Sequence, residues 1–235
     1  MRIEEMGSKK MLPLEALLWD MDGTLVDTEP MWVKCEEELM AEFGYQWSEH
    51  DALHCIGGPM ERVQLYLKEK SKSDLDPSWF GDQLIEMMLS KLKSGAMIRP
   101  GALELVNEAI ESGLRLALVS ASRRPIVDAV LEGLPFSFDL SISASEVERS
   151  KPHPEGYLRA ASEIATSIHS CVVIEDSSVG ITSGLESGAL VIGVTPQTFD
   201  HDNFHGVLDL SSVNLASLQS LHQSWFHRTL AEAEL

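Results

Sequence analysis

The chain has 235 residues, with 18 Lys and Arg against 37 Asp and Glu, so its formal net charge is −19 at pH 7. Its content of 44% hydrophobic and 23% charged residues is typical of a folded globular protein and excludes a collagen, a coiled coil and a largely disordered chain. The strong negative charge argues against nucleic acids and anionic membranes as partners, because both repel an acidic surface.

The cysteines and the N-terminus favour a cytoplasmic protein. Cys35, Cys55 and Cys171 are odd in number and far apart, which indicates reduced thiols rather than a disulfide framework or a zinc ribbon. The first ten residues lack the apolar stretch of a secretory signal, and no uncharged run approaches the roughly 18 to 20 apolar residues of a membrane span. Nothing in the sequence indicates an obligate assembly, so we expect a monomer.

Short apolar runs alternate with helical patterns along most of the chain. The apolar runs span residues 15–20, 114–119, 138–142, 171–174 and 190–194. Helical periodicity covers residues 102–112, 124–131, 154–164 and 179–187. Continuous apolar strands belong to sheets that are covered on both faces, and βαβ alternation indicates parallel order. We therefore predict an α/β fold with a doubly wound, mainly parallel, Rossmann-like sheet.

One long segment breaks this alternation. Between residues 31 and 97 only helical periods occur, which predicts an all-helical insertion directly after the first strand, with hinges at Pro30 and 98–100. The predicted helices span residues 32–43, 60–68 and 78–93. The predicted domains are a flexible leader at 1–13, a core of 14–30 and 98–215, the helical insertion at 31–97, and a C-terminal helix or tail at 216–235.

Polar residues directly follow several of the apolar runs. Ligands of open parallel sheets bind at the carboxyl ends of strands, so we expect these residues to converge on one site. In chain order they are Asp20, Asp22, Gly23, Thr24, Ser120, Ala121, Ser122, Lys151, Glu175 and Asp176.

The acids in this set predict a metal site. Asp20 and Asp22 lie two residues apart at one strand end, and two such carboxylates repel each other unless they share a cation or a proton. Asp176 adds a third carboxylate, and hard oxygen ligands favour Mg²⁺.

The remaining residues predict a phosphate site. Gly23 lets the backbone turn sharply with its N–H groups directed at an anion, and Ser120 with the amides that follow it can form the other side of a phosphate cradle. Lys151 can neutralise phosphate charge. A carboxylate nucleophile together with Mg²⁺ and a lysine can make and break an aspartyl-phosphate.

The same segments resemble a known family. Asp20-Met-Asp-Gly-Thr24, Ser120, Lys151-Pro and Ile174-Glu-Asp-Ser-Ser-Val-Gly180 are similar, in order and spacing, to the four motifs of the haloacid dehalogenase superfamily, over about residues 15–195. The insertion resembles that superfamily's small helical cap. Leu25-Val-Asp-Thr-Glu-Pro30 and Gly57-Gly-Pro59 resemble the branch that contains sugar-phosphate phosphatases and β-phosphoglucomutase.

The resemblance implies a role for each residue. Asp20 would be the nucleophile, and Asp22 would protonate the leaving alcohol and then deprotonate water. Ser120 and Lys151 would hold the transferring phosphoryl group. Mg²⁺ would be held by the Asp20 carboxylate, the backbone carbonyl of Asp22 and Asp176, with Glu175 either holding metal-bound waters or binding directly. The predicted substrate contacts are Gly23, Thr24, Ala121, Ser122 and Arg123.

The insertion would act as a cap that excludes water and contacts the leaving group. Candidate contacts are Glu29, Trp32, Arg62, Arg123 and Arg124. β-Phosphoglucomutase carries a histidine where this chain has Trp32, which weakens a mutase interpretation, because an indole is neither acid nor base.

We therefore predict a Mg²⁺-dependent phosphomonoester hydrolase that acts on a small phosphorylated metabolite, such as a sugar phosphate. Two alternatives remain: a phosphosugar mutase, and a non-catalytic protein that binds a phosphorylated ligand.

Overall fold

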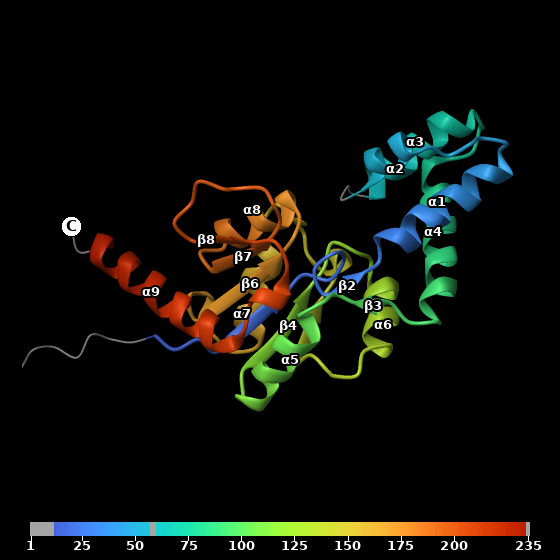
Figure 1. Ribbon diagram of the computed structural model, residues 1–235. Helices are drawn as coiled ribbons and strands as arrows, with labels where there is room; N and C mark the ends of the chain where they lie inside the picture. Colours follow the sequence, from blue (N-terminus) through green and yellow to red (C-terminus); the bar gives the residue numbers. More distant parts are fainter. Residues whose placement is uncertain (1–11, 57–59, 234–235) are drawn as a thin grey trace, which may run out of the picture.

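The structure is a computed structural model that describes residues 12–56 and 60–233. Most of the predicted leader and the Gly57-Gly-Pro59 segment lie outside the described residues. The fold is built on a six-stranded, all-parallel sheet in the order β5-β4-β1-β6-β7-β8. Figure 1 shows this sheet with helices on both of its faces. Its strands are β1 (Ala16–Trp19), β4 (Arg115–Val119), β5 (Leu140–Ile142), β6 (Cys171–Glu175), β7 (Leu190–Val194) and β8 (Phe204–Val207). The predicted α/β class with a parallel sheet is confirmed.

The last strand was not predicted. β8 pairs with β7 in parallel at the edge of the sheet. Its sequence, Phe-His-Gly-Val, has no apolar run to indicate a strand. What secures it is a tertiary contact: the Phe204 ring packs 5.0 Å from the ring of Phe199 and closely covers Gly193.

Helices cover both faces of the sheet. Side chains such as Trp19 and Leu118 form a core with α5 (Ala102–Glu111), α6 (Arg124–Glu132) and α9 (Leu215–Ala233). Their neighbours Leu18 and Val119 pack on the other face with α7 (Glu155–Glu163) and α8 (Ser178–Glu186). Alternating residues of each strand therefore belong to two buried layers, which explains the continuous apolar runs. Short 3₁₀ turns lie at Ala144–Glu146, Ile168–Ser170 and Leu210–Ser212.

The region after β1 is helical, and Figure 1 shows it as a separate group at the upper right. It contains α1 (Glu29–Glu42), α2 (Glu49–Cys55), α3 (Met60–Ser71) and α4 (Pro77–Leu92). We call α1–α4 the helical lobe. Sequence periodicity missed α2, because a seven-residue helix is too short to show a period; a capping box between Ser48 and Asp51 starts it. No helix in the described part of the chain is long and apolar enough to cross a membrane.

A short ladder joins the lobe to the sheet. The chain leaves through β2 (Val26–Asp27) and returns through β3 (Met97–Ile98), and these two strands pair antiparallel. Helix α4 also packs against α6 of the core. The lobe is thus attached at two places, one of which is a pair of strands.

The helical lobe buries an acid. Glu36 of α1 is 4% exposed, and its Oε2 atom has no hydrogen-bond partner among the described residues. The thiol of Cys55, at the end of α2, hydrogen-bonds the carboxyl. Burial, assisted by the nearby Glu29 carboxylate, raises the pKa of Glu36 to about 8, so the side chain is protonated at neutral pH.

This burial predicts a pH-dependent stability. The pKa of Glu36 is about 8 when folded, against 4.5 ordinarily, so the folded state binds this proton more tightly. The free energy of unfolding should therefore fall as pH rises from about 4.5 to 8, by at most about 5 kcal/mol from this group. We expect Glu36→Gln to raise Tm relative to wild type more at pH 8 than at pH 5. If the Tm difference between Glu36→Gln and wild type were the same at pH 5 and pH 8, the raised pKa of Glu36 would be contradicted.

A glycine at the start of α5 gives a second prediction. Gly101 has φ +80°, and a Cβ atom there would lie 2.3 Å from the backbone carbonyl carbon of Leu210. Gly113 has a similar φ of +74° but open space around it. Gly113→Ala should cost about 1 kcal/mol of strain, whereas Gly101→Ala should cost clearly more, because the backbone must also move. Thermal unfolding of both variants measures the difference, and equal losses would show that strain alone matters.

Candidate active site

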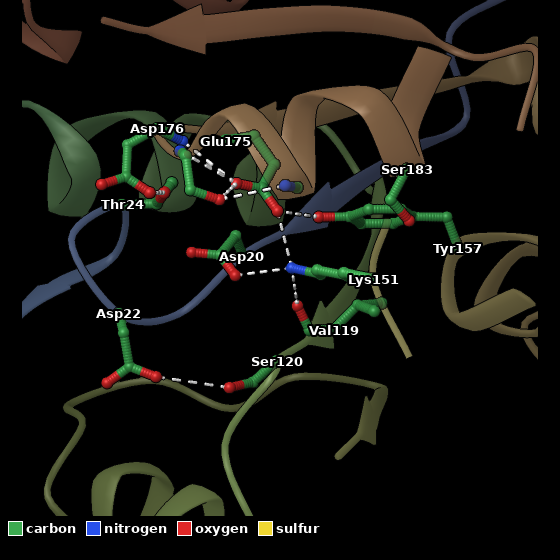
Figure 2. A network of polar contacts seen from close by, with 12 residues as sticks. Asp20, Asp22, Thr24, Val119, Ser120, Lys151, Tyr157, Glu175, Asp176 and Ser183 are labelled. Atoms are coloured by element: carbon green, nitrogen blue, oxygen red, sulfur yellow. Dashed lines mark hydrogen bonds and ion pairs between the residues drawn. The ribbon is translucent and has the colours of Figure 1, made fainter. Parts of the chain in front are cut away.

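The carboxyl ends of three neighbouring strands bring the predicted residues together. Asp20 directly follows β1, Ser120 directly follows β4, and Glu175 is the last residue of β6. Because β1 lies between β4 and β6, all three side chains meet at one edge of the sheet, as Figure 2 shows. After β1, the next strands of this sheet, β4 and β5, are added on one side of it, and β6, β7 and β8 are added on the other side. Open α/β sheets bind their ligands at such a switch in strand order.

Lys151 is the centre of the polar network. Its Nζ atom donates to Asp20 Oδ1 at 2.6 Å, to Glu175 Oε1 at 2.6 Å and to the carbonyl oxygen of Val119 at 2.8 Å. The lysine side chain is only 7% exposed, so the charge is held almost without water. Burial alone would lower the pKa of Lys151, but Asp20 and Glu175 outweigh burial and raise it above its usual range. The ammonium therefore stays charged.

Glu175 is fully buried and held from every side. Its Oε1 atom accepts from Lys151 and, at 2.8 Å, from the hydroxyl of Tyr157 on α7. Its Oε2 atom accepts from the backbone N–H of Asp176 at 3.2 Å and from the hydroxyl of Ser177 at 3.2 Å. A Cβ atom on Gly180 would overlap this carboxylate, so the glycine makes room for it. Both oxygens are thus occupied by protein donors.

Asp176 lies against the turn after β1. Its Oδ1 atom accepts from the hydroxyl of Thr24 at 3.0 Å, and a Cβ atom on Gly23 would lie 2.3 Å from its Oδ2 atom. Only a glycine adopts the φ of +84° at this position without strain, and its missing side chain leaves room for the Asp176 carboxylate. The predicted use of its N–H for an anion is wrong, because that N–H donates to the carbonyl oxygen of Val26 at 2.8 Å. The reason is local: the residues after β1 close a tight turn that uses this donor.

Asp22 faces a different set of partners. It accepts hydrogen bonds from the hydroxyls of Thr28 at 2.6 Å, Ser122 at 2.8 Å and Ser120 at 3.4 Å. In Figure 2 its carboxylate lies apart from Lys151 and close to Ser120. The two acids of the Asp-Met-Asp motif therefore have different surroundings, one beside an ammonium and one among hydroxyls.

Sequence reasoning missed two of these partners. Tyr157 lies in the first turn of α7, where its position in the sequence looks like that of any buried helix residue. Thr28 precedes α1, and only its place in the Asp27-Thr-Glu-Pro30 run could have drawn attention to it.

The acids outnumber the cations at the strand ends. Asp20, Glu175 and Asp176 each offer a carboxylate oxygen, and these atoms lie within 4.8 Å of one another. Burial, and then the Glu175 carboxylate, raise the pKa of Asp20 well above its usual range and that of Asp176 to about 6. Lys151 opposes both shifts but cannot balance three acids. The donor set of hard oxygens with excess negative charge fits a divalent cation.

The other predicted substrate residues lie around this centre. Ala121 is exposed and, with Ser120 and Lys151, lines a small depression at the end of β4. Ser122 donates to Asp22, as described above. Arg123 instead forms an ion pair across to the helical lobe, 3.2 Å from Asp82 of α4.

The remaining predicted contacts also have protein partners. Arg124 is held by Ser141, Asp128 and Glu146 on the core. Arg62 of α3 donates to the backbone carbonyl of Ile56 at 3.3 Å. Glu29 and Trp32 lie on α1, whose first turn follows directly on Thr28. Glu29 and Trp32 therefore lie at the start of the lobe, within ten residues of Asp22 in the sequence.

Curated relatives are similar to this chain over most of their length. Hexitol phosphatase B of Escherichia coli is 30% identical over 88% of this chain and 93% of its own. The fructose-1-phosphate phosphatase YqaB of the same organism is 29% identical over 76% of this chain and 95% of its own.

Solved structures agree with the fold. CbbY from Rhodobacter sphaeroides, solved in complex with phosphate, is 26% identical with a TM-score of 0.75, over 87% of this chain and 99% of that one. A β-phosphoglucomutase from Clostridium difficile has the same TM-score at 23% identity, which shows a shared fold. The family model for haloacid dehalogenase-like hydrolases matches residues 17–194, a span that contains every strand-end residue described above. The chain belongs to the haloacid dehalogenase-like hydrolases.

Proposed function

We propose that this protein is a Mg²⁺-dependent phosphatase that hydrolyses small phosphomonoesters through an aspartyl-phosphate on Asp20. The observation that carries the proposal is the contact of Lys151 with Asp20 and Glu175, at 2.6 Å each, in a buried cluster of acids at the strand ends. The hydrolase family and the named phosphatases among its relatives support the same activity.

Asp20 is proposed as the nucleophile. Lys151 holds its Oδ1 atom, and Figure 2 shows the second carboxylate oxygen pointing away from the lysine. This second oxygen attacks phosphorus, and the bond from phosphorus to the leaving oxygen breaks. Lys151 and Ser120 stabilise the charge on the phosphoryl oxygens as it is transferred. Bound Mg²⁺, held by Asp20, the Asp22 carbonyl and Asp176, would neutralise the same negative charge.

Asp22 is proposed as the general acid and base. It gives its proton to the leaving alkoxide, and then takes a proton from the water that attacks the aspartyl-phosphate, which restores Asp20 and releases phosphate. Its hydrogen bonds from Thr28 and Ser122 orient the carboxyl group. Its hydroxyl partners and its separation from Lys151 distinguish it from Asp20, which suits the two acids to different roles.

Glu175 is proposed to support the site rather than to bind metal directly. Both of its oxygens already accept hydrogen bonds from Lys151, Tyr157, Asp176 and Ser177. It therefore orients the lysine and the backbone that carries Asp176. The helical lobe is proposed to act as the cap that covers the phosphoryl group.

Substitution of the nucleophile tests the proposal. Asp20→Asn should fold normally, because the amide keeps the shape of the side chain, but should lose about 10³-fold or more in kcat, since an amide is a poor nucleophile. Phosphate release from a panel of sugar and hexitol phosphates, with Mg²⁺ and with EDTA, is the measurement. The exposed acid Asp200 provides a matched control, and Asp200→Asn should keep wild-type rates.

Two results would contradict this function. If Asp20→Asn had a kcat within tenfold of the wild-type value, Asp20 would not be the nucleophile. Conversion of a sugar 1-phosphate to the 6-phosphate without free phosphate, followed by ³¹P NMR, would indicate a mutase.

Metal binding can be measured without turnover. A ligand that binds only the folded state raises its Tm, so Mg²⁺ should stabilise the wild type. Asp176→Asn removes one carboxylate of the cluster and should reduce this Mg²⁺-dependent rise in Tm, while Asp200→Asn should not change it. A wild-type Tm that does not respond to millimolar Mg²⁺ would argue against the metal site.

A further inference from the structure

A tyrosine of α7 lies directly beside Lys151. Tyr157 is fully buried, and the centre of its ring lies 5.0 Å from the lysine Nζ atom. Its hydroxyl donates to Glu175 Oε1 at 2.8 Å, and the same oxygen atom accepts from Lys151. In Figure 2 the ring runs alongside the lysine, with its hydroxyl directed at the glutamate. Tyr157 therefore contacts both the ammonium and one of the two carboxylates that hold it.

Two features of the chain place Tyr157 in this position. The preceding residue, Gly156, lies so close to β4 that a Cβ atom on it would be 2.8 Å from the Val119 side chain. The loop before α7 is also fixed, because the hydroxyl of Ser183 on α8 donates to the carbonyl oxygen of His153 at 2.8 Å. The start of α7, and with it the tyrosine ring, is thus held against both β4 and α8.

Two acids share the Lys151 ammonium. Its Nζ atom lies 2.6 Å from Asp20 Oδ1 and 2.6 Å from Glu175 Oε1. An ammonium has three N–H groups, and the third donates to the carbonyl oxygen of Val119, so all three are engaged. An ammonium drawn closer to Glu175 would make a weaker contact with Asp20, the proposed nucleophile. The position of the lysine therefore depends on how strongly the glutamate attracts it.

The tyrosine weakens this attraction. Its hydroxyl gives Glu175 Oε1 a second donor, so this oxygen does not depend on the lysine alone. Burial, and then the Glu175 carboxylate, raise the pKa of Tyr157 well above its usual range, so the phenol keeps its proton and stays a donor. The face of the ring also attracts a cation, which adds a contact to Lys151 that neither acid provides.

We propose that Tyr157 is a positioning residue, which keeps the Lys151 ammonium in contact with Asp20 and next to the phosphoryl group that is transferred. It acts through Lys151 and Glu175 and not on the substrate itself. This inference rests on the proposed phosphatase activity, in which the lysine stabilises charge on the phosphoryl oxygens. Because such stabilisation matters most in the transition state, loss of the tyrosine hydroxyl should lower kcat more than it changes KM.

Tyr157→Phe tests the hydroxyl and keeps the ring. Phosphate release from p-nitrophenyl phosphate and from sorbitol 6-phosphate, with Mg²⁺, is measured for the wild type and the variant well below the Tm of each. We expect kcat to fall about tenfold, because a hydrogen bond to a charged group is lost, and KM to stay within about threefold. Tyr157→Leu also removes the ring and should lower kcat further.

A second tyrosine provides a matched control. In the helical lobe, the hydroxyl of Tyr66 donates to the buried carboxylate of Asp51 at 2.7 Å. Tyr66→Phe removes the same kind of hydrogen bond, so it should also lower Tm, but it should keep kcat within about twofold of wild type. If Tyr157 had only a structural role, Tyr157→Phe would behave in the same way as Tyr66→Phe.

A double-mutant cycle tests whether Tyr157 acts through Glu175. Glu175→Gln removes the charge that attracts the ammonium away from Asp20. In this background, Tyr157→Phe should change kcat by no more than about twofold, because the two changes affect one interaction. A tenfold loss in both backgrounds would show that the tyrosine acts independently of the glutamate, and the proposed route would be wrong.

The outcomes separate this inference from the proposed function. If the wild type released no phosphate from either ester, the phosphatase would be overturned, and the role of Tyr157 with it. If the wild type were active and Tyr157→Phe kept its kcat within about twofold, only the positioning role would be overturned. A tenfold rise in KM with an unchanged kcat would also overturn it, because the tyrosine would then affect substrate binding and not the transition state.

Discussion

The buried ammonium of Lys151 is the interaction on which the site depends. It compensates the charge of Asp20 and Glu175, which come from the ends of two adjacent strands, and it also binds the carbonyl of Val119 on a third. Taking these groups out of water is costly, and loss of the lysine would leave the two buried carboxylates without a cation, at about 3 to 5 kcal/mol. The same contact that holds the strand ends together therefore also sets the electrostatics of the site.

That electrostatic field divides the acids into two groups. Asp20 and Asp176 share the buried region around Lys151 and Glu175, where excess negative charge favours a cation. Asp22 lies two residues away in sequence, but its neighbours are the hydroxyls of Thr28, Ser120 and Ser122. One short turn thus places one carboxylate beside an ammonium and another among hydroxyl donors.

Much of this arrangement could be predicted, because parallel strands align their carboxyl ends. Asp20, Ser120 and Asp176 directly follow apolar runs, and that position alone predicts that they meet. Tyr157 could not be found in this way, since its role depends on how α7 packs over β4 and β1, which brings its hydroxyl to Glu175. The N–H of Gly23 was misjudged because a turn's internal hydrogen bonds are set by geometry and not by residue type. Helix α2 escaped prediction because seven residues are too few to show a helical period, and strand β8 because its sequence contains no apolar run.

The pairing of β2 with β3 affects how the helical lobe can change in evolution. Val26 lies opposite Ile98, so the entry and exit of a segment of about 70 residues are neighbours in space. A segment whose ends meet in this way can be shortened, lengthened or exchanged for another without rerouting the sheet. The residues proposed to transfer the phosphoryl group, Asp20, Asp22, Ser120 and Lys151, lie outside that segment. The helical lobe can therefore be altered or replaced in evolution between β2 and β3, while the residues at the strand ends stay in place.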